Sequence, residues 1–429
     1  MERLTREKFN EKSAFWLLAL ALATLPFTRF LMLPIALFLM IFFLTDNLYV
    51  SHFKIIKENK LLFPFFITLS MFVLSLLGTI YSNNVPKAIS DWECKLWFLA
   101  APLGILPLCG KFSLQQIRTL MIVFCLSVTA TAIGNFVIST AKFAQSGDVS
   151  QFFYQNASHF FGEKPTHPSY LSMYCAVAWL LEVGLLTEAG AVHRRAVRWL
   201  LAASLLIQPA YILLLQSKAG LLVFAVVFVS AIVYAVRRRA VPLWAGLVVL
   251  AVCGAVGVAG VSGKLSSANR LSDMRQQLRA DERSNPYNGT LQRIAVWETS
   301  CELAGENLPF GTGTGDVTDE LCKRYEAKGY TYILGKRLNC HNQYLQHLVG
   351  LGIPGLAALL LFLGISLWEA IRQKDFLQGV WFFVIAGNLL VESMLETRAG
   401  SNFIPLMTML LLLYGRAMRS SEASSQSSL

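Results

Sequence analysis

Charge is scarce in this chain: Asp, Glu, Lys and Arg together make up only 15% of its 429 residues. A soluble domain carries about 25% of such residues. Hydrophobic residues instead form 55% of the chain, and the mean hydropathy is +0.52. A helix that crosses a bilayer needs roughly 20 apolar residues, and apolar runs recur along the whole sequence. The composition excludes an ordinary soluble domain and predicts an all-α polytopic membrane protein.

The signatures of several enzyme classes are also missing. The sequence contains no serine-hydrolase elbow, no P-loop and no His-Glu-x-x-His motif. The run Gly311-Thr-Gly-Thr-Gly315 lacks a following Lys-Ser/Thr and a preceding strand, so it predicts a turn rather than a phosphate loop. The acidic pair Asp91-Trp-Glu93 is interpreted as a solvated loop, because nothing else supports a divalent metal site. We therefore expect no metal and no cofactor.

Targeting and repeat signals are absent too. The polar head, residues 1–12, precedes an apolar run without a small-residue cleavage site, so we expect no removable signal peptide. No internal repeat with a convincing period is visible. The Ser-rich end, Ser420–Leu429, is predicted to be disordered.

The apolar runs predict about twelve membrane spans. Pro102 and Pro107 interrupt the fourth. One long polar segment, 262–340, separates spans nine and ten and is expected to be partly helical. The chain thus divides into spans 1–9 (1–261), a large loop (262–340), spans 10–12 (341–416) and a tail (417–429). The predicted spans are 14–27, 30–45, 61–80, 96–110, 119–141, 168–187, 199–216, 219–236, 241–261, 343–368, 376–394 and 402–416.

Basic residues predict the orientation of these spans. With the N-terminus inside, the inner segments hold 19 Lys and Arg and the short outer segments hold 7. Long loops are exempt from the positive-inside rule. Both termini are therefore predicted to be cytoplasmic and the large loop external. The net charge of +11 lies mostly in these short loops, so we expect no nucleic-acid partner.

Arginines mark the large loop. Arg275, Arg279 and Arg283 follow Arg270 and fall four residues apart, so a helix would align them on one face. Such a helix suits the membrane interface, where its cations bind either lipid headgroups or an anionic substrate. Arg293 lies where an amphipathic helix is predicted to begin, and a partly buried Arg there needs an anionic partner or ligand.

Three further polar residues lie at predicted span ends on the outer side. His341 precedes span ten, and an unperturbed imidazole titrates near pH 6.5, so it could take a proton from a hydroxyl at neutral pH. A structural helix-capping role is its alternative. Lys218 occupies a tight turn between two spans, either as a functional cation or as one that snorkels to headgroups. His167 precedes Pro168 and is either a cap or a ligand-binding residue.

The cysteines leave one question open. Cys301, Cys322 and Cys340 share the large loop, where one disulfide is possible in an oxidising compartment. Most of the other cysteines lie in or beside predicted spans and are expected to be inert packing residues: Cys109, Cys125, Cys175 and Cys253.

In their order and membrane placement, several short motifs resemble the O-antigen ligase and polymerase superfamily of bacterial envelope glycosyltransferases. The layout is similar too, with about twelve GT-C-like spans and one large periplasmic loop before the last three. The motifs are His167-Pro-Ser-Tyr170, Ser217-Lys-Ala-Gly220, Arg293 with Trp297, Pro309-Phe-Gly-x-Gly313, and His341-Asn-Gln-Tyr-Leu345 with Gly352-Ile-Pro-Gly355.

The resemblance implies a function at the periplasmic face of the bacterial inner membrane. In this superfamily a glycan on undecaprenyl pyrophosphate is transferred to an acceptor hydroxyl without metal or nucleotide. It implies catalytic roles for His341 and Arg293. The residues predicted to bind the diphosphate or the acceptor are Lys218, Arg283, Arg279, His167 and Asn342. Lys218 stands where the family usually has Arg, which keeps the charge but loses the bidentate fork.

The resemblance favours an O-antigen ligase that uses lipid A-core as acceptor and inverts the anomeric centre. The alternatives within the superfamily are an O-antigen or exopolysaccharide polymerase and a protein O-oligosaccharyltransferase. A more distant alternative is an ion-coupled transporter, since twelve spans suit one. The expected partners are the lipid-linked donor, the acceptor glycan and membrane lipids.

Overall fold

The computed structural model describes residues 2–27, 32–44, 48–158, 166–188, 190–244 and 289–427. Within these ranges the regular elements are all helices, which confirms the predicted all-α class. The ninth predicted span lies mostly outside the described residues, as do Arg270, Arg275, Arg279 and Arg283.

The helices follow the predicted apolar runs. In chain order they are α1 (Glu2–Thr24), α2 (Met32–Leu44), α3 (Leu48–Glu58), α4 (Leu62–Leu77), α5 (Val85–Cys94), α6 (Trp97–Ile105), η2 (Leu106–Leu108), α7 (Leu114–Ser146), η3 (Val149–Phe152), η4 (Tyr154–Ser158), α8 (Pro168–Thr187), α9 (Arg195–Leu215), α10 (Lys218–Arg237), α13 (Gly289–Glu306), α14 (Val317–Ala327), α15 (Thr331–Lys336), α16 (Gln343–Gln373), α17 (Phe376–Val391), η7 (Met394–Glu396) and α18 (Arg398–Ser427).

Several of these helices suit a membrane by length and composition. Five qualify among the described residues, namely α7, α8, α9, α10 and α16, and a sixth does if α3 and α4 form one broken span. The predicted count of twelve is not reached by this measure because other apolar helices are short or interrupted. α2 has 13 residues, and α6 has 9 and gives way to a 3-10 turn at Pro107. The chain is a multi-pass membrane protein.

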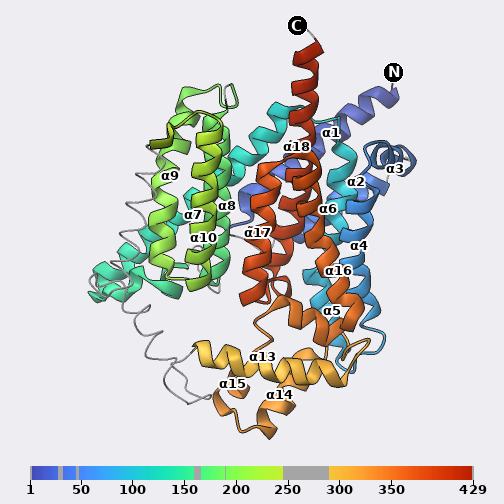
Figure 1. The fold of residues 1–429 in the computed structure, drawn as a ribbon, viewed down its shortest axis with the longest axis vertical. Helices are drawn as coiled ribbons and strands as arrows, with labels where there is room; N and C mark the ends of the chain where they lie inside the picture. The colour runs from blue at the N-terminus through green and yellow to red at the C-terminus, as the bar shows by residue number, and fades with distance from the viewer. Residues whose placement is uncertain are drawn as a thin grey trace.

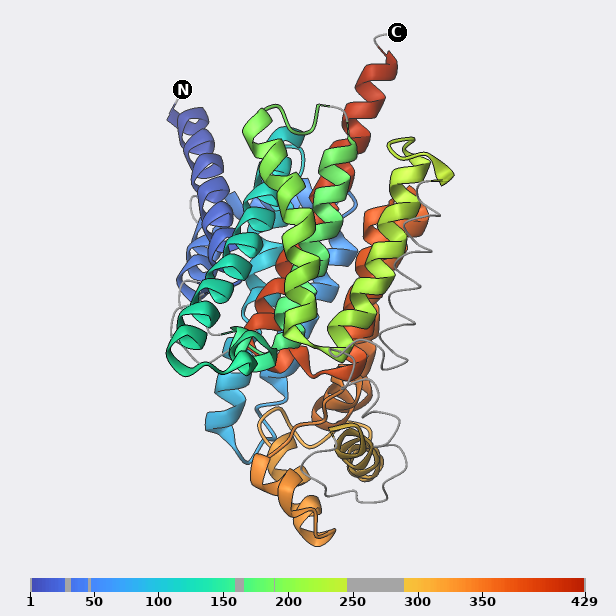
Figure 2. The same cartoon turned by 90° about the vertical axis from the view of Figure 1, so that its left-hand side faces the viewer.

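The helices form one bundle with two different ends. Both termini lie at one end, and α13, α14 and α15 gather at the other (Figures 1 and 2). Segments that the basic-residue count placed on one side lie together at the end that carries the termini. There, the Arg416 guanidinium donates to the Asn59 carbonyl at 2.9 Å, and Arg118 pairs with Glu188.

Two hydrophobic cores hold the molecule together. The larger one fills the bundle, where Trp97, Trp381 and Phe403 are almost fully buried. The smaller one joins α13, α14 and α15 to the first turns of α16 through Val296, Leu321 and other buried residues. The second core fixes the described part of the large loop against the bundle end.

The end of the chain differs from the prediction. Residues 420–427, expected to be disordered, continue α18 as a helix to Ser427. Extending an existing helix costs far less than nucleating one. Serine hydroxyls also bond to carbonyls one turn back, as Ser420 does to Arg416 at 3.1 Å and Ser424 to Ser420 at 3.0 Å.

Candidate functional site

The motifs that carry the resemblance meet at the end of the bundle where α13, α14 and α15 lie (Figure 1). Among the described helices, α8, α10 and α16 begin there with a side-chain cap from one of these motifs, namely His167, Ser217 and Asn342. Helix N-termini carry a partial positive charge and unpaired N–H groups. This end of the molecule is therefore electrostatically suited to an anionic ligand.

His341 occupies the residue before the Asn342 cap, with a left-handed backbone at φ 44°. Its N–H donates to the Asn339 side chain at 3.1 Å, and its carbonyl accepts from the Trp297 indole at 3.3 Å. The ring Nδ1 lies 3.0 Å from Oε2 of Glu392. A carboxylate there fixes the tautomer with the proton on Nδ1, which leaves Nε2 as the acceptor. That is the form a general base requires.

Arg293 approaches the same carboxylate from α13. Its guanidinium pairs with Oε1 of Glu392. The sequence predicted that a partly buried Arg here needs an anionic partner or ligand, and the partner is Glu392. One guanidinium carries five N–H donors, so this pairing leaves donors for a second anion.

Glu392 is the residue that sequence reasoning missed. It follows the last residue of α17, and its side chain is only 7% exposed. Burial alone would raise its pKa, but the hydrogen bond from His341 and the charge of Arg293 hold the pKa below its ordinary value. The sequence feature that could have identified Glu392 is a carboxylate at the outer end of an otherwise apolar span, where an ionisable residue is costly.

Two chain segments run side by side behind this cluster. The Asn342 N–H donates to the Ser393 hydroxyl at 3.2 Å. Gln343 then uses both ends of its amide: its oxygen accepts from the Leu395 N–H at 2.7 Å, and its nitrogen donates to Glu396 at 3.0 Å. Residues 341–343 are thus fastened in register to residues 392–396, which fixes the imidazole relative to its carboxylate.

A buried ion pair anchors this arrangement to a third element. Lys95, at the α5–α6 junction, places its ammonium 3.2 Å from Glu396, and the two side chains are 5% and 11% exposed. Burial alone would lower the pKa of Lys95, but the Glu396 charge holds it above its ordinary value. No sequence pattern connects Lys95 with Glu396, 301 residues away.

The acidic pair at residues 91 and 93 is not the solvated loop that we predicted. Asp91 lies on α5, is 5% exposed and pairs with Lys87. Glu93 lies 3.7 Å from Arg398. The prediction was wrong for Asp91 because the amphipathic helix α5 turns this side chain inward.

The start of α8, after His167, packs against the start of α10, at Lys218. The Ser169 and Ser217 hydroxyls are 3.1 Å apart, and a side chain at Gly220 would come within 2.3 Å of Ser172. His167 accepts from the Ser169 N–H at 3.4 Å, so the cap role is observed. Burial lowers its pKa, and Glu392, His341 and Arg293 lie near enough to act on it. These helix starts therefore belong to the same site.

The glycine run 311–315 is a packing turn, as predicted. The Thr312 N–H donates to the Val349 carbonyl at 2.8 Å, and the Ile353 N–H donates to the Pro309 carbonyl at 2.9 Å. Gly352 breaks α16 with φ 62° and ψ −150°, and a Cβ there would lie 1.9 Å from the Pro309 oxygen. The turn and the kink together hold the first two turns of α16, and hence His341, in place.

The structure also shows the surroundings of Asn342 and of the three loop cysteines. The Asn342 side-chain oxygen accepts from the Tyr344 and Leu345 N–H groups, at 2.9 and 3.1 Å, so it caps α16, and its role in substrate binding stays a prediction. The three loop cysteines, Cys301, Cys322 and Cys340, are free thiols.

Comparison with known proteins indicates a family. The family model described as O-antigen ligase matches residues 201–360. No curated protein matches the chain. The matched region runs from α9 into α16 and contains Lys218, Arg293 and His341. The match over residues 201–360 supports membership of the O-antigen ligase and polymerase superfamily.

Proposed function

We propose that this protein is an O-antigen ligase of the bacterial inner membrane. It transfers an oligo- or polysaccharide from undecaprenyl pyrophosphate to a sugar hydroxyl of lipid A-core at the periplasmic face. The family match supports a ligase or polymerase type of activity. The observation that carries the proposal is the single carboxylate, Glu392, that holds both a base, His341, and a cation, Arg293.

In this proposal His341 is the general base. Nε2 accepts the proton of the acceptor hydroxyl while its oxygen bonds to the anomeric carbon of the donor. The bond from that carbon to the diphosphate oxygen breaks, and undecaprenyl pyrophosphate leaves with the electron pair. Direct displacement inverts the anomeric centre. Glu392 orients the imidazole and stabilises the imidazolium that forms.

Cations and helix ends neutralise the departing diphosphate. Arg293 supplies the guanidinium donors that Glu392 does not use, and Lys218 begins α10. The N-termini of α8, α10 and α16 add partial positive charge at the same end. Fixed positive groups aimed at developing charge are a major source of catalysis, so we propose that transfer needs no metal. Arg279, Arg283, His167 and Asn342 stay predicted contacts of donor or acceptor.

One observation favours the distant alternative, an ion-coupled transporter. Glu182 lies fully buried on α8, where its Oε1 accepts from the Gln208 amide at 2.9 Å, and that amide also donates to Thr129 at 3.0 Å. Ionisable residues deep in a span are typical of ion pathways. A transporter would depend on Glu182 and not on His341.

Reconstitution tests the proposal. Purified protein receives lipid-linked glycan and lipid A-core, without metal or ATP, and we expect conjugated lipopolysaccharide. Extension of the lipid-linked glycan instead would identify a polymerase, and glycan on added protein would identify a protein transferase. If His341→Ala matches the wild type while Glu182→Gln is inactive, the proposed site is wrong.

A further inference from the structure

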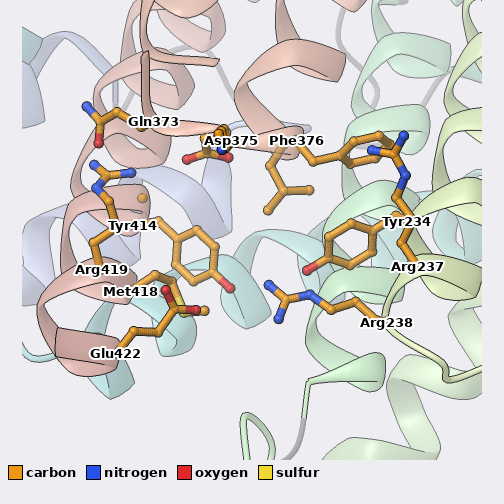
Figure 3. A pocket seen from close by; sticks show the side chains of 13 residues that line it. Tyr234, Arg237, Arg238, Gln373, Asp375, Phe376, Tyr414, Met418, Arg419 and Glu422 are labelled. Atoms are coloured by element: carbon orange, nitrogen blue, oxygen red, sulfur yellow. The ribbon is translucent and has the colours of Figure 1, made fainter. Parts of the chain in front are cut away.

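A cavity of about 300 Å³ lies at the opposite end of the molecule from the candidate site. It sits between the last turn of α10, the junction of α16 with α17, and the extension of α18 (Figures 1 and 3). His341, Arg293, Glu392 and Lys218 of the candidate site do not line this cavity.

Cations predominate in the lining. Four line the cavity, namely Arg237, Arg238, Lys374 and Arg419, against two carboxylates, Asp375 and Glu422. Within the described part of the chain, neither Arg237 nor Lys374 has an ion-pair partner.

One of the two carboxylates is committed elsewhere. Asp375 caps α17 by accepting from the Gln378 N–H at 3.2 Å. Burial raises the pKa of Asp375 and lowers the pKa of Arg419. A bound anion would offset the cost of holding these positive charges together.

Aromatic side chains shape the cavity around Arg238. Tyr234 stacks on Phe376 with ring centroids 5.3 Å apart, and the Arg238 guanidinium lies 5.5 Å from the Tyr234 centroid. In Figure 3 this guanidinium points into the space between Tyr234 and Tyr414. The Tyr414 hydroxyl is held by Glu188 at 3.0 Å, so that wall is fixed.

We propose that this cavity binds a phosphate group. Guanidinium and ammonium groups are the side chains that recognise phosphate, and basic pockets between membrane helices bind anionic lipid headgroups. An anionic phospholipid is one source of the group, and a soluble phosphate compound is the other. The site is independent of the proposed transfer reaction, because none of its residues takes part in that reaction.

Thermal unfolding of the full-length protein in neutral detergent tests this site. The probes are phosphatidylglycerol, phosphatidylcholine and inorganic phosphate. The variant is Arg238→Gln with Lys374→Gln, and both side chains are exposed, so the fold should survive. The control is Arg194→Gln with Arg198→Gln, two exposed cations at the start of α9 that lie outside the cavity.

We expect phosphatidylglycerol to raise the melting temperature of the wild type and of the control. Each cation removed should weaken the apparent affinity about fivefold, hence about 25-fold for the variant. A response to inorganic phosphate that the variant loses would support the site and identify a soluble source. If the variant responds to both phosphate probes as the control does, the cavity is not a phosphate site. If the double variant has a much lower melting temperature than the wild type in the absence of probes, Lys374→Gln alone replaces it. The response of Lys374→Gln to the probes is then compared with that of the control.

Discussion

The buried pair of Lys95 and Glu396 offers the sharpest test of how the site is held. We consider Lys95→Met, which keeps the length of the side chain and removes its charge. Glu396 would then be a buried carboxylate whose remaining side-chain donor is the amide of Gln343. Breaking a buried ion pair from one side costs about 3–5 kcal/mol, a large share of the 5–15 kcal/mol typical of total stability.

The double variant separates charge from packing. Lys95→Met with Glu396→Gln leaves no unpaired charge, and neutral replacement of a buried pair is often close to neutral in stability. We therefore expect it to be more stable than Lys95→Met alone. The control is Lys323→Met, because Lys323 pairs with Glu320 at 69% exposure and an exposed pair is worth about 0–1 kcal/mol.

Thermal unfolding in detergent gives the stability of each variant, and transfer kinetics give its effect on the site. Glu396 is hydrogen-bonded to Gln343, which lies two residues from His341. We therefore expect Lys95→Met to lower kcat by a larger factor than it changes KM. Restoration of kcat by the double variant would support positioning. The reasoning fails if Lys95→Met is as stable as Lys323→Met, or if the double variant is the less stable of the two Lys95 variants.

Four further outcomes follow from the site. Arg293→Ala should abolish transfer while Arg293→Lys keeps a small fraction, since charge survives without the fork; full activity of a stable Arg293→Ala protein would refute its role. His341→Ala should lose about 10²–10⁴-fold in rate and still bind donor; weak donor binding with a normal rate at saturation would make it a diphosphate ligand. Because the pKa of Glu392 is lower in the folded protein, Glu392 contributes its full stabilisation above pH 4.5, and this contribution is lost as the pH falls through the folded pKa. The melting temperature should therefore fall more steeply at acid pH in the wild type than in Glu392→Gln, and equal pH profiles of the two proteins would contradict the prediction. Gly352→Ala should destabilise the protein far more than Gly364→Ala, which meets open space; equal melting temperatures would rule out the strained kink.

The sequence predicted the local parts of this site well. Apolar runs located the helices, and short signals located where α8, α10 and α16 begin. His167, predicted as a cap or as a ligand-binding residue, caps α8, whereas the caps of α10 and α16 are Ser217, beside Lys218 in the tight turn, and Asn342 rather than His341. Such signals work because a cap acts on backbone groups within three residues of itself.

The non-local parts could not be predicted. Glu392 lies 51 residues from His341 and 99 from Arg293, and Lys95 lies 301 residues from Glu396. No periodicity or spacing rule connects residues that meet only after several helices have packed. The prediction that Asp91 is solvated was wrong for the same reason, since the burial of Asp91 depends on neighbours from distant elements.

The carboxylate that His341 and Arg293 share also affects how much each cation of the site contributes to donor binding. Glu392 cancels the charge of Arg293 before any ligand arrives, so that pair contributes little long-range attraction for a diphosphate. Among the described residues, the N-termini of α8, α10 and α16 add positive potential at this end, each equivalent to roughly half a charge. Donor binding should therefore depend on these helix ends and on the predicted contacts Lys218, Arg279 and Arg283. In the proposed mechanism Arg293 acts later, when the leaving diphosphate gains charge and competes with Glu392 for the N–H donors of Arg293. On that view the Glu392 link couples departure of the diphosphate to the base, because an Arg293 drawn toward the product leaves more of the carboxylate's charge to stabilise the imidazolium of His341.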